Sequence, residues 1–155
     1  MERFLLALST TEQSKEAISY ALDLAKQRQA ELTVLFILDS NVPATIFEKL
    51  TDIGFIGERP SAELKEAIAA EYSQQAVKRL EEIKVEADAA GVKCQTFLEA
   101  GDFSEKSLEA IGRFAADMII LNRTRRTAIS RLFLGSAVDR LLRQAPCEIK
   151  IFEEE

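Results

Sequence analysis

The sequence has no histidine and no tryptophan, and it has only two cysteines and three prolines among 155 residues. Without histidine, the chain lacks the usual general base and the commonest ligand of transition metals. Two cysteines, Cys94 and Cys147, are too few for a disulfide scaffold. No apolar run approaches the roughly 18 residues that cross a bilayer. These absences argue against a histidine-dependent metalloenzyme, a disulfide-rich secreted domain and a membrane-inserted protein.

Basic residues are also few relative to acidic ones, with 20 Lys and Arg against 26 Asp and Glu and a net charge of −6. Nucleic acid is therefore not expected as a partner, because phosphate binding favours a basic surface. The apolar start Phe4–Leu8 is followed at once by polar Ser9–Glu12, which argues against a signal peptide. We expect a cytoplasmic protein with a single domain over residues 1–155.

Short apolar runs alternate with helical patterns along the whole chain. This alternation predicts an open, Rossmann-like parallel sheet with helices on both faces and right-handed crossovers. Ligands of such sheets bind beyond the carboxyl ends of the strands, where the strand order reverses. Periodicity alone does not give the strand order. The predicted strands are Phe4–Leu8, Leu32–Leu38, Val92–Leu98, Met118–Leu121 and Glu148–Phe152.

Segments between these elements have distinct compositions. Residues 40–60 contain prolines, glycines and apolar residues, which predicts a long variable loop packed over the sheet. Ser61 is expected to cap a long helix that stops at Gly91. Asn122–Arg131 is expected to be a polar, basic loop, and Glu153–Glu155 a solvated tail.

The C-terminal stretch from Leu121 to Cys147 resembles the signature of the universal stress protein family. In nucleotide-binding members this signature reads Gly-x2-Gly-x9-Gly-(Ser/Thr), and the chain has Gly135-Ser136 at its end and Ala145-Pro146-Cys147 before the last strand. Gly101-Asp102 fits the family's turn after the third strand. The resemblance covers the whole chain. It implies an adenine nucleotide alpha hydrolase-like sheet of order 3-2-1-4-5, with the switch point between strands one and four.

The same resemblance assigns candidate nucleotide-binding residues. The backbone at Ile37 would lie against an adenine, and Gly135 and Ser136 would offer backbone amides to phosphate at the start of the last helix. Ser136 is equally well explained as a helix N-cap. ATP or AMP is the implied ligand.

The chain departs from the family pattern at three positions. Ser9 stands where nucleotide-binding members have an aspartate, and Asn122 and Arg125 stand at the first two glycines of the signature. Asn tolerates a left-handed backbone, so the change at Asn122 is mild. Arg125 places a long side chain where phosphate would meet bare backbone. We therefore expect ordinary ATP binding to be weakened or lost.

Arginines near the signature allow another interpretation. Arg123, Arg125 and Arg126 could bind a phosphate or carboxylate of a different ligand. The alternative is a solvated loop whose arginines pair with surface glutamates.

We find no catalytic constellation and no metal site, and we attribute Asp102 to helix capping. Cys94 and Cys147 are expected on the two edge strands as buried structural thiols, with a redox sensor as the alternative. The family resemblance further implies a homodimer through the last strand, Glu148–Phe152. The favoured function is a non-enzymatic, stress-related regulatory dimer with a degenerate pocket that acts on a protein partner. The alternative is a protein that binds ATP or AMP by rearranged contacts, with slow hydrolysis.

Overall fold

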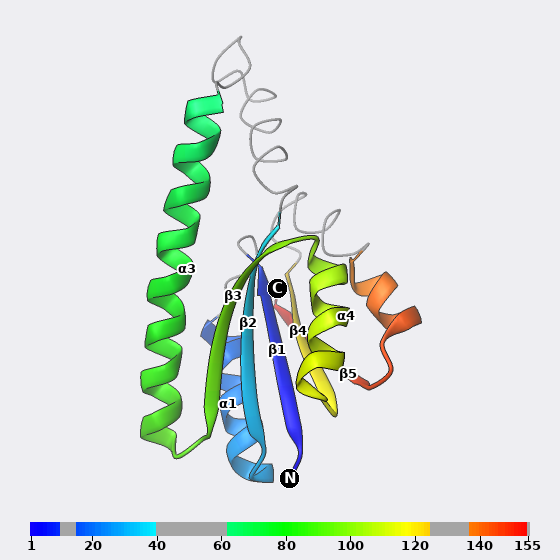
Figure 1. Ribbon diagram of the computed structural model, residues 1–155. Coiled ribbons are helices and arrows are strands. Elements are labelled where there is room, and N and C mark those ends of the chain that lie inside the picture. The colour runs from blue at the N-terminus through cyan, green and yellow to red at the C-terminus, as the bar shows by residue number, and fades with distance from the viewer. Residues whose placement is uncertain (10–14, 40–61, 125–136, 155) are drawn as a thin grey trace.

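The computed structural model describes residues 1–9, 15–39, 62–124 and 137–154, and its centre is a five-stranded sheet (Figure 1). The strand order is β3-β2-β1-β4-β5 and every pairing is parallel. This confirms the expected α/β fold and the order that the family resemblance implied. The strands are β1 (Arg3–Ser9), β2 (Glu31–Asp39), β3 (Cys94–Gly101), β4 (Met118–Thr124) and β5 (Glu148–Glu154).

Helices cover both faces of this sheet (Figure 1). α1 (Lys15–Arg28) and α3 (Ala62–Ala90) share one apolar cluster with the sheet. α4 (Phe103–Phe114) and the helical residues 137–144 share the cluster on the opposite face. The chain is thus a three-layer sandwich with two separate cores.

The central strand β1 is apolar without interruption from Phe4 to Leu8 because it is covered on both faces. Leu6 and Leu8 belong to the core under α1 and α3, whereas Leu5 and Ala7 belong to the core under α4. Successive side chains of a strand point to opposite faces, so a strand covered on both sides needs apolar residues at every position.

The end of α3 follows the stop predicted at Gly91. Gly91 has a φ of 73°, and its amide donates to the carbonyl of Asp88 at 3.2 Å. The amide of Val92 donates to the carbonyl of Ala87 at 2.9 Å. A left-handed residue after the last turn lets the chain satisfy these carbonyls and leave the helix, and glycine adopts this conformation without a Cβ clash.

Several predicted boundaries were wrong. β4 continues through Asn122–Thr124, which we expected to begin a loop, and β5 continues through Glu153 and Glu154, which we expected in the tail. Arg123 lies opposite Glu153 and Thr124 opposite Glu154 in the ladder. Strand pairing uses backbone groups, so polar side chains at the end of an edge pair do not stop it.

Two further boundaries differ from the predictions. β3 begins at Cys94 and ends at Gly101, later than the predicted Val92–Leu98. Cys147 lies one residue before β5 instead of on it. The predicted loop over residues 40–60 and the cap at Ser61 lie outside the described residues.

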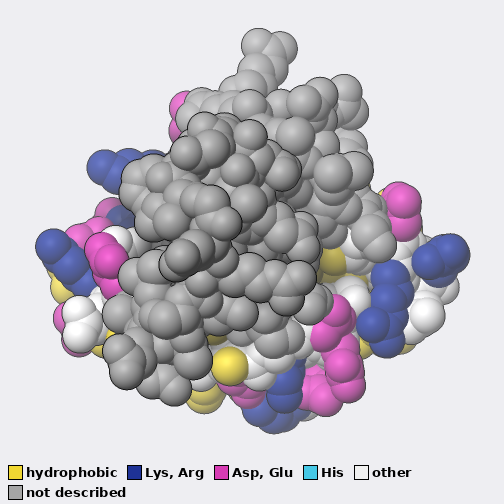
Figure 2. All heavy atoms as spheres, turned by 90° about the horizontal axis from the view of Figure 1, so that it is seen from above, with side chains coloured by type: hydrophobic (Ala, Val, Ile, Leu, Met, Phe, Trp, Pro, Cys, Tyr) yellow, Lys and Arg dark blue, Asp and Glu magenta, His cyan; other side chains and the backbone are white. Residues whose placement is uncertain are grey.

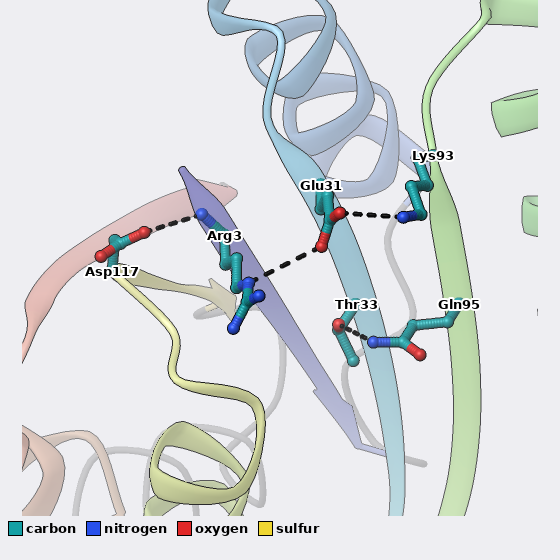
Figure 3. A network of polar contacts seen from close by, with 6 residues as sticks. All are labelled: Arg3, Glu31, Thr33, Lys93, Gln95 and Asp117. Carbon is teal, nitrogen blue, oxygen red and sulfur yellow. Dashed lines mark hydrogen bonds and ion pairs between the residues drawn. The ribbon is translucent and has the colours of Figure 1, made fainter. Parts of the chain in front are cut away.

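A polar network links the strands at the amino edge of the sheet (Figure 3). The backbone amide of Arg3 donates to Asp117 Oδ2 at 2.8 Å, and Arg3 Nε lies 3.7 Å from Glu31 Oε2. Lys93 Nζ donates to Glu31 Oε1 at 3.0 Å. The hydrogen bond from Lys93, with the charges of Lys93 and Arg3, holds the pKa of Glu31 below its usual value. The network lies opposite to the edge where ligands of such sheets bind.

Candidate functional site

The carboxyl edge of the sheet is where this topology predicts a ligand. β1 pairs with β2 on one side and with β4 on the other, so the strand order reverses at the β1–β4 pair. Figure 2 views the molecule from this end of the sheet, and acidic and basic side chains of the described residues are visible around its rim. The candidate site therefore centres on the end of β1.

Ser9 and Ile37 meet at this edge as the resemblance implied. They are Cα partners at the end of the β1–β2 ladder, and both are 0% exposed. Leu5 and Ala7 of β1 face the α4 layer, as does Leu35 of β2. By strand alternation, Ser9 and Ile37 face that layer too. The position of the family's aspartate is therefore a buried, uncharged hydroxyl.

Asn122 lies on the opposite face of the sheet from this pair. It follows Leu121, which is the Cα partner of Ala7 and belongs to the α4-side core, so alternation directs Asn122 towards the α1 layer. Asn122 is 4% exposed. The structure thus brings Ser9, Ile37 and Asn122 to one edge, but their side chains do not share one face.

Sequence reasoning missed a polar bracket between two helices beside this edge. We define the bracket as Asp102, Ser104 and Arg140. Ser104 Oγ donates to Asp102 Oδ2 at 2.7 Å. Arg140 Nη1 donates to Ser104 Oγ at 3.0 Å and lies 3.5 Å from Asp102 Oδ2. The bracket joins the start of α4 to the helix over residues 137–144.

Asp102 is also the N-cap of α4, as predicted. Its backbone is extended, with φ −73° and ψ 131°, and its carboxylate accepts from the backbone amide of Glu105 at 3.0 Å. This backbone hydrogen bond, the Ser104 hydroxyl and the Arg140 charge hold the pKa of Asp102 below its usual value. The cap could be predicted from sequence because it is local. The contact with Arg140 spans 38 positions and leaves no local pattern.

Gly101 makes the turn from β3 into this cap. Its φ is 149°, a conformation that side chains with a Cβ rarely adopt. A Cβ on Gly101 would lie 2.7 Å from Lys106 Cε, because the Lys106 side chain packs over the glycine. The turn at Gly101-Asp102 was therefore predicted correctly.

The sequence profile of the universal stress protein family matches residues 1–152. The chain belongs to the universal stress protein family. A universal stress protein of Methanocaldococcus jannaschii is 24% identical over 155 residues, which cover 99% of this chain and 82% of that protein. Universal stress protein YxiE of Bacillus subtilis is 25% identical over 149 residues, which cover 96% of this chain and 97% of YxiE.

Solved universal stress protein structures share the fold. One determined in complex with cAMP has a TM-score of 0.64 and 15% identity, and the match covers 99% of this chain and 98% of the other. A family protein from Arabidopsis thaliana with AMP bound has a TM-score of 0.63 and 14% identity, with 100% and 93% covered. At these identities the likeness shows the fold alone.

The rest of the family signature lies outside the described residues. This holds for Arg125, Arg126, Gly135 and Ser136. Arg123 is part of β4 by its backbone. The seat for phosphate and the alternative anion site therefore remain predictions from sequence.

Neither cysteine in this universal stress protein forms a disulfide. Cys94 is buried, and burial raises the pKa of its thiol to about 11. Cys147 is only half-buried, contrary to the expectation of two buried thiols, and burial also raises its pKa. Raised thiol pKa values disfavour the reactive thiolate.

The described residues contain no group of three or more His, Cys, Asp or Glu side chains that could hold a metal ion. Among the helices in the described part of the chain, none is long and apolar enough to cross a membrane.

Proposed function

We propose that this universal stress protein is a non-enzymatic regulatory protein of the stress response with a degenerate pocket, in which ordinary ATP binding is weakened or lost. The observation that carries this proposal is Ser9. It occupies the carboxyl end of β1 at the topological switch point and is fully buried. A ribose hydroxyl at this position would meet a neutral hydroxyl in place of the carboxylate of nucleotide-binding members.

The size of this loss can be estimated from hydrogen-bond energies. A hydrogen bond to a charged group contributes about 1.5–3 kcal/mol, against about 0.5–1.5 kcal/mol for a neutral pair. The difference of about 1 kcal/mol corresponds to roughly fivefold weaker binding. If Arg125 also removes one amide–phosphate contact, the total loss reaches about two orders of magnitude.

Restoring the family residues tests the proposal. Isothermal titration calorimetry should detect no binding of Mg-ATP by the wild type at low micromolar concentration. The double variant Ser9→Asp, Arg125→Gly should bind ATP at least about tenfold more tightly than the wild type. Ser9→Asn with Arg125→Gly is the matched control, because asparagine has the size of aspartate without its charge. Micromolar ATP binding by the wild type would overturn the proposal.

The proposed functional unit is a homodimer through β5. β5 is an edge strand that pairs with β4. The amide of Glu148 donates to the carbonyl of Asp117, next to β4. Because the backbone groups of successive residues face opposite sides of a strand, the N–H and C=O groups of Ile149 and Ile151 face away from β4. These outward groups could pair antiparallel with β5 of a second copy, in a two-fold dimer.

Proline scanning of β5 tests this interface. Ile151→Pro removes an outward N–H and should convert a dimer into a monomer in light scattering at micromolar concentration. Ile151→Ala is the control for the lost side chain, which packs against the α4-side core, and it should remain dimeric. Lys150→Pro instead removes an N–H that faces β4, so it should lower the melting temperature as well. A monomeric wild type, or an Ile151→Pro variant that stays folded and dimeric, would refute the interface.

A second candidate function is the binding of ATP or AMP by rearranged contacts. Relatives with the same fold bind cAMP and AMP. The β1–β2 ladder ends at Ser9 and Ile37, while β2 continues to Asp39. The backbone of Ile37 faces β1 by alternation, because the amide of Glu31 bonds to the carbonyl of Glu2.

The second candidate therefore assigns the adenine contact to the backbone of Ile37, at the end of this ladder. Native mass spectrometry of freshly purified protein separates the two functions. A co-purifying AMP or cAMP favours the second candidate. Protein free of nucleotide, with no shift in melting temperature on adding AMP, ATP or inorganic phosphate, favours the first.

A further inference from the structure

β3 forms the second edge of the sheet. A lysine side chain binds one of the backbone groups of β3 that face away from the sheet. The carbonyl of Lys93 accepts from the amide of Leu32 of β2 at 2.9 Å. Backbone groups alternate in direction along a strand, so the next carbonyl, that of Cys94, faces away from the sheet. Lys84 Nζ of α3 donates to this carbonyl at 2.5 Å.

The position of Lys84 is itself set by its helix. Lys84 Nζ lies 3.4 Å from Asp88 Oδ1, one turn further along α3. α3 runs beside β3 for the length of the strand (Figure 1). The Lys84 side chain is 45% exposed, so the ammonium group remains hydrated while it covers the carbonyl.

A second cation lies beside β3 on the opposite face of the sheet. Arg113 Nη2 of α4 lies 2.7 Å from Glu99 Oε1. The Arg113 guanidinium carbon lies 4.5 Å from the ring centroid of Phe114 and 5.6 Å from that of Phe97. Charged side chains therefore flank β3 from both helical layers.

The part of β3 beside these cations is suited to strand pairing. Cys94–Leu98 carries no charge and includes Thr96 and Phe97, which favour strands. A second copy offers an identical segment, and identical strands readily pair through their exposed edges. An added strand could not donate to the Cys94 carbonyl without displacing Lys84 and desolvating its charge.

We propose that Lys84 closes the β3 edge against β3 of a second copy, so that the chain self-associates through one edge of its sheet only. The part of this inference that concerns pairing through β5 rests on the proposed function. The closure of β3 by Lys84 does not depend on it. With β3 closed, pairing through β5 ends at two subunits. With β3 open as well, pairing through both edges would continue into longer assemblies.

The test compares Lys84→Met with the wild type by light scattering over a hundredfold range of concentration. Methionine keeps the length and helix propensity of the side chain but donates no hydrogen bond. The average mass of the Lys84→Met protein should rise to at least twice that of the wild type at the highest concentration. Lys84→Arg is the matched control, which retains the donor and the charge and should keep the wild-type mass.

A second substitution tests whether the association of Lys84→Met takes place at β3. The amide of Thr96 faces outward by the same alternation, so Thr96→Pro should block strand addition without breaking the β2–β3 ladder. Adding Thr96→Pro to Lys84→Met should return the mass to the wild-type value. The inference is overturned if Lys84→Met keeps the wild-type mass, or if its association persists in the double variant. A wild type that is monomeric would refute the β5 dimer, while the same comparison would still decide the role of Lys84.

Discussion

Replacing Asp102 by alanine is the most informative single perturbation of the candidate site. The change removes the N-cap of α4, and capping residues replaced by alanine cost about 0.5–2 kcal/mol. It also removes the ion pair with Arg140, whose side chain is 40% exposed. A pair this exposed adds only about 0–1 kcal/mol. We therefore expect Asp102→Ala to lower the free energy of unfolding by about 1–2 kcal/mol.

The two contributions of Asp102 can be separated with asparagine. Asparagine caps a helix as well as aspartate does, so Asp102→Asn keeps the bond to the Glu105 amide and loses the charge beside Arg140. For a domain of this size, 1 kcal/mol shifts the melting temperature by about 2–4 °C. Thermal melts followed by circular dichroism at pH 7 should show a drop of about 2–8 °C for alanine and a smaller drop, at most about 4 °C, for asparagine.

The pH dependence provides an internal control. The pKa of Asp102 is lowered in the folded protein, so its charge stabilises the fold above the unfolded pKa, and this stability is lost as pH falls through the folded pKa. The difference in the free energy of unfolding between the wild type and Asp102→Asn should therefore become smaller below about pH 4. The reasoning is refuted if asparagine destabilises as much as alanine at pH 7, or if the difference is independent of pH.

Three further predictions concern single positions. Ala115 has a φ of 51°, so Ala115→Gly should raise the free energy of unfolding by about 1 kcal/mol, measured by urea denaturation. Gly101→Ala should lower it by about 1–3 kcal/mol, mainly through its φ of 149°, because the flexible end of Lys106 can move aside. Iodoacetamide at pH 8, followed by mass spectrometry of the intact and digested protein, should label half-buried Cys147 before buried Cys94. Equal labelling of the two thiols would contradict the burial of Cys94.

Much of the fold could be predicted because the cores leave a local pattern in the sequence. Phe4–Leu8 is apolar at every position and Leu32–Leu38 at every position except Thr33, which is typical of strands covered on both faces. Gly91 marks the end of α3 because only the local backbone conformation decides it. The strand order came from the family resemblance, since periodicity carries no information about which strands are neighbours.

The errors share a different physical origin. Asn122–Thr124 and Glu153–Glu154 look like loop and tail because their side chains are polar, yet they pair through their backbones. The bracket around Asp102 and the contact of Lys84 were missed because each joins residues on different elements. Helical periodicity tells which side of a helix is buried. It does not tell which acceptor a long charged side chain will reach.

The bracket also links the candidate site to the rest of the domain. Gly135 and Ser136 directly precede the helical residues 137–144, so Arg140 lies about one turn beyond the end of the family signature. Through Arg140 this helix is bonded to the cap of α4, and that cap follows Gly101 at the carboxyl end of β3. Polar contacts, in addition to the apolar core around Val138 and Leu141, thus hold the last helix against the layer that faces Ser9 and Ile37. A ligand or a substitution that moves the helix over residues 137–144 must therefore either break the bracket or move the start of α4 with it.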